Sequence, residues 1–242
     1  MKYVPGQSVG DIYGTPWSRY GDDPNSLYSD KSLPLLIGSS GFPVLTPYST
    51  QRILGNSYPK WIGSIGNTFA YKNWNLYFLW DFRQGLQKYD QFSNFMAAFG
   101  ESAITANREA TMVFDGVLAD GSKNTKAVWL GQGKGPDGVN YGSAGYYRAV
   151  YRGIAENFVE DASWVRLRTA TLSYRIPDKI LKNSFIKNIS LACTGNNLVL
   201  FTKYKGFDPE SSSTPAGSNA NGFAGFSYPA MRSFMLTLNL GL

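Results

Sequence analysis

The chain has 242 residues, a formal net charge of +6, 17 % charged residues, no histidine and a single cysteine. These counts exclude an internal disulfide, histidine-based acid–base chemistry, and zinc or copper sites built on nitrogen and sulfur ligands. Charged residues lie below the roughly 25 % of an average soluble domain, whereas glycine (26), tyrosine (16) and phenylalanine (15) are plentiful, which favours an all-β protein with long turns.

The excess of positive charge lies in the last third of the chain. Residues 162–242 hold 9 Lys/Arg and 3 Asp/Glu, whereas the two kinds balance in residues 1–161. Such charge is typical of loops and interfaces of a membrane protein, and it also fits a basic lumen or rim that attracts anionic substrates. The basic residues are dispersed along the sequence, so no nucleic-acid partner is expected.

The first 58 residues predict one short strand followed by a long loop. Residues 5–14 form the strand, which glycines bound on both sides. Residues 15–58 are rich in Pro, Ser, Gly and Tyr without a sustained period, and one further short strand is expected near residues 42–48. Loops of this length are unusual in compact soluble domains but normal on the extracellular side of outer-membrane barrels.

Residues 59–85 are the clearest hairpin in the sequence. Large apolar residues occupy odd positions up to Tyr71 and even positions from Leu76, with a turn over residues 72–75. A period of two places each set on one face of a strand, so Asp81 and Arg83 belong to the opposite face. A soluble sandwich would bury the apolar face and a barrel would turn it to lipid, and the pattern alone leaves both open.

Residues 86–160 show little periodicity. One strand is expected within residues 103–118, a loop rich in Gly, Lys and Asp over 119–143, and a short helix or irregular turn over 144–160. The sequence therefore predicts that this stretch separates two regions of regular strands.

Alternation returns after residue 161 and continues to the carboxyl terminus. The apolar positions change parity near Thr169, which predicts a β-bulge there, and Pro177 ends the strand. Further strands are expected at residues 187–204 and 234–242, the last with five apolar residues at alternate positions. The whole chain thus contains about seven or eight strands, near the roughly 9–11 residues of a tilted spanning strand.

No run of the sequence approaches the roughly 18 apolar residues of a membrane-spanning helix. The start of the chain suggests that the sequence is one piece of a longer polypeptide or one product of a split gene. The first six residues, Met-Lys-Tyr-Val-Pro-Gly, contain no apolar core of a signal peptide. A membrane barrel has to be exported before it folds, so an export signal is expected elsewhere.

Five short motifs follow one another in a fixed order: Gly6–Gly14, Leu54–Trp61, Asp161–Tyr174, Asn196–Glu210 and Tyr228–Leu242. In this order they resemble the carboxyl end of SusC/RagA-type TonB-linked outer-membrane transporters. The resemblance implies an all-β fold, an antiparallel transmembrane β-barrel with long extracellular loops. Residues 1–242 would supply about the last third of its roughly 22 strands, without the plug and the amino-terminal strands. The chain ends in Gly241-Leu242, whereas the family usually ends in an aromatic residue.

The resemblance also implies a function. Such transporters lie in the cell outer membrane as multi-pass barrels and import oligosaccharides or peptides without an enzymatic step or a cofactor. The implied partners are a SusD-like surface lipoprotein, TonB through the absent amino-terminal part, the remaining strands and plug, and outer-membrane lipid.

Two groups of residues are candidates for ligand recognition. The polar faces of the predicted strands supply lumen candidates: Asp81, Arg83, Arg166, Arg168 and Asn239. The long loops supply aromatic candidates: Trp17, Tyr20, Tyr28, Trp129 and Tyr146. Aromatic rings with a polar tip suit sugars and protein interfaces, and a lid contact is expected ahead of direct substrate contact. The alternatives are polar residues that brace a wet barrel wall, and aromatics that form an interfacial girdle or pack the loops.

Other function classes find weaker support. A soluble or surface-attached carbohydrate-binding β-sandwich and a small closed barrel of about eight strands remain alternatives. Asp208 and Glu210 mimic a glycosidase carboxylate pair, but their Pro-containing turn favours a structural role. Acidic loop residues at 22–30 and at Asp137 offer oxygen ligands for calcium, yet their spacing indicates solvated turns.

Overall fold

The computed structural model describes residues 4–182, 185–213 and 222–241, and it divides the chain into two units. The first unit comprises residues 1–58, 87–160 and 212–227, and the second comprises residues 59–86, 161–211 and 228–242. In the described part of the chain, no helix is long and apolar enough to cross a membrane.

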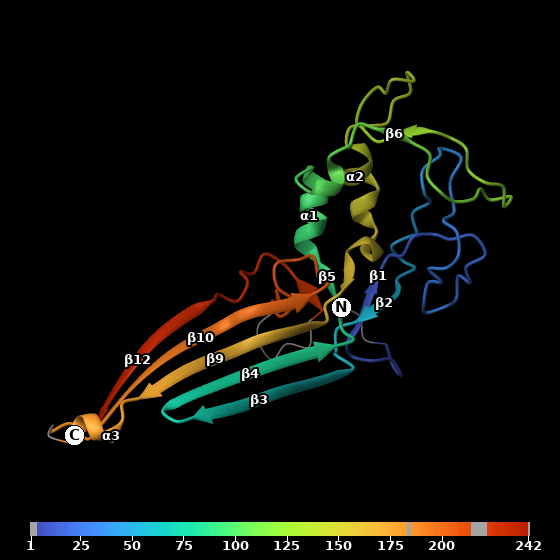
Figure 1. The fold of residues 1–242 in the computed structure, drawn as a ribbon. Coiled ribbons are helices and arrows are strands. Elements are labelled where there is room, and N and C mark those ends of the chain that lie inside the picture. Colours follow the sequence, from blue (N-terminus) through green and yellow to red (C-terminus); the bar gives the residue numbers. More distant parts are fainter. Residues whose placement is uncertain (1–3, 183–184, 214–221, 242) are drawn as a thin grey trace. The chain divides into compact units, whose positions relative to one another are not determined.

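The second unit is a single antiparallel sheet of five long strands in the order β12-β10-β9-β4-β3 (Figure 1). Its strands are β3 (Trp61–Tyr71), β4 (Trp74–Gln84), β9 (Trp164–Arg175), β10 (Asn188–Thr202) and β12 (Ser233–Gly241). The predicted hairpin is confirmed as β3 and β4, which meet at Lys72, a residue with a positive φ of 53°. Pro177 follows β9 and precedes the short helix α3 (Asp178–Leu181), as its effect on a strand predicts.

One face of this sheet is apolar across all five strands. The register places Phe69, Leu76, Leu172, Cys193 and Leu236 side by side in one row. The four aromatic or aliphatic residues of this row, Phe69, Leu76, Leu172 and Leu236, are 40–72 % exposed. Water does not favour a continuous apolar face of this size, so the sheet is suited to an environment that covers it.

The predicted bulge in β9 is confirmed. Thr169 pairs with Leu79 of β4, and the next pair toward the start of β9 is Leu167 with Trp80. Arg168 is therefore the one extra residue of β9 in this ladder. Because of this extra residue, the apolar residues before and after it lie on the same face of the sheet, although their positions in the sequence differ in parity. Arg168 itself lies on the polar face.

The polar face is held by bonds between side chains of neighbouring strands. The hydroxyls of Thr171 and Thr194 lie 2.9 Å apart, and the Asn196 amide donates to the Ser233 hydroxyl at 3.2 Å. The two faces thus differ in chemistry as the alternation predicts.

The strand count differs from the expectation. Five strands of nine residues or more are present in the described residues, instead of seven or eight of spanning length. The sheet does not close on itself there, so the closed barrel is not seen within this chain. The remaining strands are two to five residues long because they lie in loops rich in Gly and Pro. Leu242, expected at the end of the last strand, lies outside the described residues.

The first unit consists mainly of loops with short regular elements. Two small antiparallel pairs are β1 (Asp11–Gly14) with β2 (Arg52–Asn56) and β6 (Thr111–Met112) with β7 (Val128–Trp129). A three-stranded sheet has the order β11-β5-β8, from Phe223–Ala224, Gln87–Asp90 and Val159–Asp161. The helices are α1 (Gln91–Phe99) and α2 (Gly145–Ala149), with single 3₁₀ turns over Ala103–Thr105, Tyr151–Gly153 and Ala155–Phe158.

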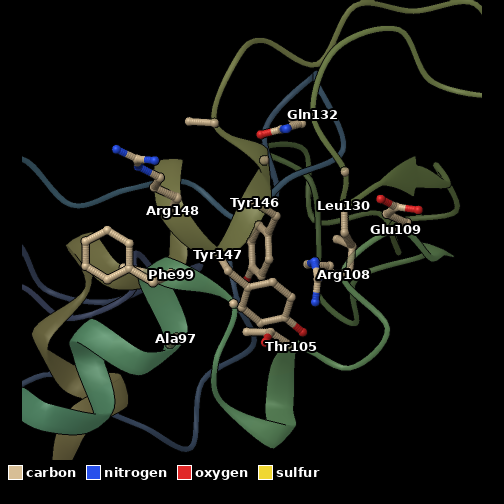
Figure 2. Close-up of a pocket in the computed structure, with 15 residues that line it drawn as sticks. Ala97, Phe99, Thr105, Arg108, Glu109, Leu130, Gln132, Tyr146, Tyr147 and Arg148 are labelled. Carbon is tan, nitrogen blue, oxygen red and sulfur yellow. The ribbon is translucent and has the colours of Figure 1, made fainter.

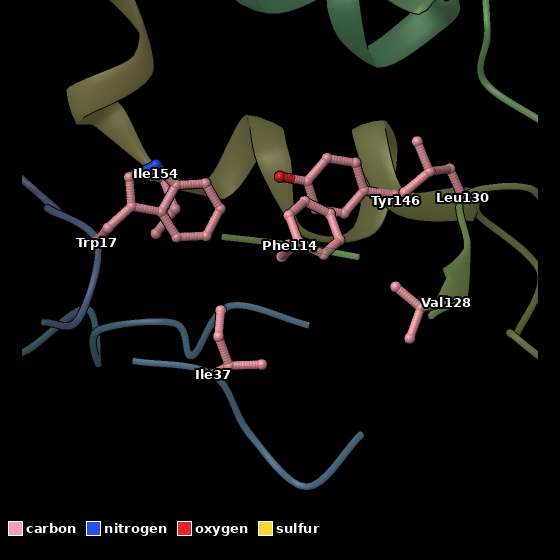
Figure 3. Packing of buried hydrophobic residues seen from close by; sticks show 7 residues of the cluster. All are labelled: Trp17, Ile37, Phe114, Val128, Leu130, Tyr146 and Ile154. Atoms are coloured by element: carbon pink, nitrogen blue, oxygen red, sulfur yellow. The ribbon is translucent and has the colours of Figure 1, made fainter. Parts of the chain in front are cut away.

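An aromatic core holds the loops of this unit together (Figure 3). Its seven buried residues come from distant parts of the sequence: Trp17, Ile37, Phe114, Val128, Leu130, Tyr146 and Ile154. The ring of Phe42 stacks on that of Tyr146 with centroids 5.8 Å apart. Because the loops carry little regular structure, burial of these side chains stabilises the path of the loops.

Helix α1 has clear boundaries that explain why it forms. The Asp90 carboxylate accepts a hydrogen bond from the Ser93 backbone N–H at 3.0 Å and caps the first turn. Gly100 ends the helix in the left-handed conformation at φ 77°, where glycine carries no steric cost. This helix is not predicted from the sequence pattern of residues 86–160.

Three local expectations for the first unit have mixed outcomes. The helix or irregular turn expected at 144–160 is confirmed by α2 and the 3₁₀ turns that follow it. The strand expected at 5–14 is limited to β1, and residues 42–48 form isolated bridges instead of a strand. The strand expected within 103–118 is limited to the two residues of β6, because the backbone before it turns on itself, with the Ala110 N–H donating to the Asn107 carbonyl at 2.9 Å.

Candidate functional site

The polar face of the long sheet carries a network of two arginines and three carboxylates. At its centre, Nη2 of Arg166 lies 2.6 Å from Oδ1 of Asp208, and both side chains are 3 % exposed. Glu210 forms a second ion pair with the same guanidinium, with Oε2 3.1 Å from Nε of Arg166. Strand β9 positions the arginine, and the segment after β10 positions both acids.

The bulge of β9 brings the second arginine into the same network. Arg168 Nε donates to Asp81 on β4 at 2.9 Å. Its two terminal nitrogens donate to the two oxygens of Glu210 at 3.0 and 2.8 Å, a bidentate arrangement. Glu210 therefore bridges Arg166 and Arg168, and Asp81 ties the network to the neighbouring strand.

Asp208 is also anchored by the backbone. Its Oδ1 accepts from the Glu210 N–H at 2.9 Å, and its Oδ2 accepts from the Ala230 N–H at 3.0 Å. Burial alone would raise the pKa of the Asp208 carboxyl, but Arg166 and the two backbone donors together hold that pKa below its usual value. The group is thus a buried carboxylate with every partner supplied by the chain itself.

A buried indole lies beneath these charges. Trp164 is 2 % exposed, and the guanidinium carbons of Arg83, Arg166 and Arg168 lie 5.7, 5.7 and 5.6 Å from its ring centroid. Cation–π attraction therefore adds to the ion pairs and includes Arg83, whose side chain is exposed.

The structure brings four of the five lumen candidates together and leaves one apart. Asp81, Arg83, Arg166 and Arg168 share the network around Trp164. Asn239 lies on β12, where its amide donates to the Ser190 hydroxyl at 3.4 Å. Arg166 and Arg168 already form ion pairs with carboxylates of the chain. These contacts favour a structural role for the two arginines over direct contact with a substrate.

The loop aromatics divide into buried and exposed residues. Trp17 and Tyr146 are 7 % and 8 % exposed and belong to the aromatic core, which favours the alternative that these aromatics pack the loops. Trp129 donates its indole N–H to the Glu109 carbonyl at 2.6 Å. Tyr20 and Tyr28 are 41 % and 57 % exposed and stay available to a partner.

A pocket of about 230 Å³ opens in the first unit, between the end of α1 and the start of α2 (Figure 2). Phe99, Tyr146 and Tyr147 supply its aromatic surface, and Arg108 and Arg148 supply positive charge. Phe99, Arg108 and Arg148 are not predicted from the sequence, because residues 97–109 and 144–148 carry no periodic pattern that places them together.

The acidic loop segments have partners that explain them as turns. Asp22 forms an ion pair with Arg52 at 2.7 Å, and Asp30 accepts from the Ser32 backbone and hydroxyl. The Tyr141 hydroxyl donates to Asp137 at 2.6 Å and, with the Val139 N–H, lowers the pKa of that carboxyl. Across residues 4–182, 185–213 and 222–241, no group of three or more acidic or cysteine side chains could hold a metal ion.

Known proteins with similar sequences are TonB-dependent receptors, although no protein-family model matches the chain. TonB-dependent receptor P39 of Formosa agariphila is 27 % identical over 196 residues, which cover 78 % of this chain and 17 % of that protein. Receptor P26 of the same organism is 28 % identical over 192 residues, with the same shares of 78 % and 17 %. Receptor P3 is 35 % identical over 91 residues, or 36 % of this chain and 9 % of that protein.

Solved structures with a similar fold come from the RagAB system. The RagAB peptide importer in its open-open state aligns with a TM-score of 0.57 and 17 % identity, over 100 % of this chain and 24 % of that one. The RagAB peptide transporter gives the same TM-score at 16 % identity, over 98 % and 24 %. The chain is SusC/RagA-like. This SusC/RagA-like chain spans only 17 % of the length of the P39 and P26 receptors.

Three of the five motifs of the SusC/RagA-like chain meet in the ion network. The motif at 161–174 supplies Arg166 and Arg168, and the motif at 196–210 supplies Asp208 and Glu210. The motif at 228–242 supplies the Ala230 N–H that binds Asp208. The Pro-containing acidic motif is therefore a structural turn, as the sequence favours, because both of its carboxylates bind arginines of β9.

Proposed function

We propose that this chain forms part of the barrel wall and the extracellular loops of an outer-membrane transporter that imports nutrients with energy from TonB. The observation that carries the proposal is the apolar face that crosses all five strands, where residues such as Leu236 and Phe234 are 72 % and 74 % exposed. Lipid covers such a face at a lower free energy than water does. The named TonB-dependent receptors among its relatives support the same function.

The open sheet requires further strands to complete it. Strands β3 and β12 are the two edges of the sheet within the described residues. Each unpaired backbone group costs several kcal/mol in lipid, so strands and a plug outside this chain complete the barrel in this proposal. Five strands are closer to a quarter than to a third of a barrel of about 22 strands.

Partners and ligand class belong to the same proposal. A SusD-like lipoprotein covers the extracellular mouth, and TonB acts on a part of the transporter outside this chain. The imported ligand is an oligosaccharide or a peptide, and no covalent bond changes during import. The similar fold of the RagAB peptide importer supports this class of ligand and partner.

The first test is the intact mass and peptide map of the protein extracted in detergent from outer membranes. A mass far above 26.7 kDa with upstream peptides supports one segment of a single transporter chain. A 26.7 kDa species that copurifies with a separate amino-terminal piece supports a barrel of split chains. The small species alone and soluble without detergent contradicts the transporter and favours the carbohydrate-binding sandwich.

Energy coupling is the second test. Cells that express the protein are offered labelled oligosaccharides or peptides, with and without a functional TonB. Uptake that requires TonB supports the proposal, and uptake that persists at the same rate without TonB contradicts it.

A further inference from the structure

Two exposed arginines of the loop unit, Arg108 and Arg148, line the pocket between α1 and α2. Arg19 pairs with Glu156 at 2.7 Å, Arg52 pairs with Asp22 at 2.7 Å, and Arg168 pairs with Glu210. In contrast, no carboxylate of residues 4–182, 185–213 or 222–241 forms an ion pair with Arg108 or Arg148. We propose that the pocket they line binds a ligand that carries a carboxylate.

Contacts without charge hold both arginines at the pocket. The guanidinium of Arg148 lies 5.8 Å from the ring centroid of Phe99, so the end of α1 supports it. Arg108 runs past Gly100, where a Cβ in place of the glycine hydrogen would lie 3.7 Å from Cδ of Arg108. Figure 2 shows the two guanidinium groups on either side of the Tyr147 ring in this view. The two guanidinium groups are therefore held at the pocket without an ion pair to a carboxylate of the described residues.

Two of the hydroxyl groups around the pocket already have partners within the chain. The Thr105 hydroxyl donates to the Ser102 carbonyl at 2.6 Å, and the Tyr147 hydroxyl donates to the Ile104 carbonyl at 2.7 Å. Tyr147 also packs edge-on against Tyr146 with centroids 5.2 Å apart. These bonds fix the aromatic surface and leave the two guanidinium groups as the charged donors for a ligand.

The charge and size of the pocket define the ligand class. Arg108 and Arg148 outnumber the one acidic lining residue, Glu109, so the lining carries net positive charge. A guanidinium matches a carboxylate in a bidentate fashion, which a neutral group does not reproduce. A volume of about 230 Å³ is below the usual range of drug-sized pockets, so one sugar ring or one amino-acid side chain fits it.

Two sources provide this chemistry: a uronic acid in an acidic oligosaccharide, or an aspartate or glutamate in a peptide. The choice between them rests on the proposed import function, whereas binding of the carboxylate does not require transport. The probes are therefore tri-galacturonate with its fully methyl-esterified form, and the tripeptide acetyl-Ala-Glu-Ala-amide with acetyl-Ala-Gln-Ala-amide. Within each pair, the carboxylate is replaced by a neutral group of similar size.

Calorimetric titration of the detergent-purified protein tests the proposal with variants Arg108→Gln and Arg148→Gln. At least one acidic probe should bind about 10-fold more tightly than its neutral partner, and each variant should lose roughly 10-fold in affinity for that probe alone. Arg108→Lys and Arg148→Lys keep the charge and should lose less. Arg152→Gln, an exposed arginine that does not line the pocket, is the matched control.

Three results would overturn the assignment: equal binding of acidic and neutral probes, no binding of any acidic probe, or the same loss with Arg152→Gln. TonB-dependent uptake is measured separately on the same variants. If uptake of neutral ligands persists while acidic probes do not bind, the pocket assignment fails and the import function stands. If acidic probes bind but uptake never depends on TonB, the import function fails and the pocket assignment stands.

Discussion

Arg166 and Asp208 form an ion pair with Nη2 and Oδ1 2.6 Å apart and with both side chains almost completely buried. The pair joins strand β9 to the segment that follows β10, and Asp208 extends the link to the Ala230 backbone. Because the Arg166 guanidinium already pairs with Asp208 and Glu210, we expect it to stabilise the sheet more than to capture a ligand.

Loss of the arginine should destabilise the protein strongly. Arg166→Met leaves Asp208 buried without its charge partner, which should lower the free energy of unfolding by roughly 3–5 kcal/mol. The thermal unfolding midpoint of the detergent-purified protein measures the loss. The double variant Arg166→Met with Asp208→Leu removes both charges and should recover much of the stability. A single variant as stable as the parent would contradict the buried pair.

The stability supplied by Asp208 should depend on pH. Its pKa in the folded protein is lower than in the unfolded chain, where the usual value is about 3.9. The contribution is therefore complete above that value and disappears as the pH falls below about 4. Unfolding midpoints of the parent and Asp208→Asn should differ most near neutral pH and converge in acid. A difference that stays constant from neutral pH to about pH 3 would argue against this assignment.

Charge on the apolar face should impair insertion. Leu238 lies on the apolar face and Thr237 on the polar face of the same strand, as their partners Leu191 and Ala192 show. Leu238→Arg should cost roughly 2–4 kcal/mol near the middle of the membrane, whereas Thr237→Arg should cost far less. Heat-modifiable folded protein in outer-membrane fractions is the measurement. Equal yields of both variants would rule out lipid contact on this face.

The buried loop aromatic should control stability of the first unit. Tyr146→Ala removes a ring at the centre of the core and should destabilise the unit by roughly 3–5 kcal/mol. Tyr28→Ala changes a residue that is 57 % exposed and should stay within roughly 0.5 kcal/mol of the parent. Thermal unfolding together with protease sensitivity of residues 87–160 compares the two. Similar small effects would show that Tyr146 is not a core residue.

Local alternation was sufficient to predict the long strands. Large apolar residues recur at alternate positions of β3, β4 and β12, so a period of two is visible in a single sequence. The parity change at Thr169 likewise identified the bulge before the register was known. These features depend only on residues that are neighbours in the sequence, so they can be predicted without knowledge of tertiary contacts.

The ion network and the pocket could not be predicted in this way. Asp81, Arg168 and Glu210 meet because of the register between strands that are distant in the sequence, and no spacing rule encodes that register. Trp17 and Tyr146 look like loop aromatics in the sequence, and only the fold shows that they share a core. Helix α1 had its two end signals, Asp90 and Gly100, but nine residues give too few turns for a clear apolar stripe.

The single extra residue in β9 makes the strand sensitive to the parity of its length. Deletion of Arg168 would remove the bulge and exchange the polar and apolar faces along one half of β9. The affected half would be either the residues up to Leu167 or the residues from Thr169 onward. Loss or gain of two residues would preserve both faces and shift only the register. Length variation among homologues of this strand should therefore occur in even steps, and an odd step should be accompanied by a second odd step nearby.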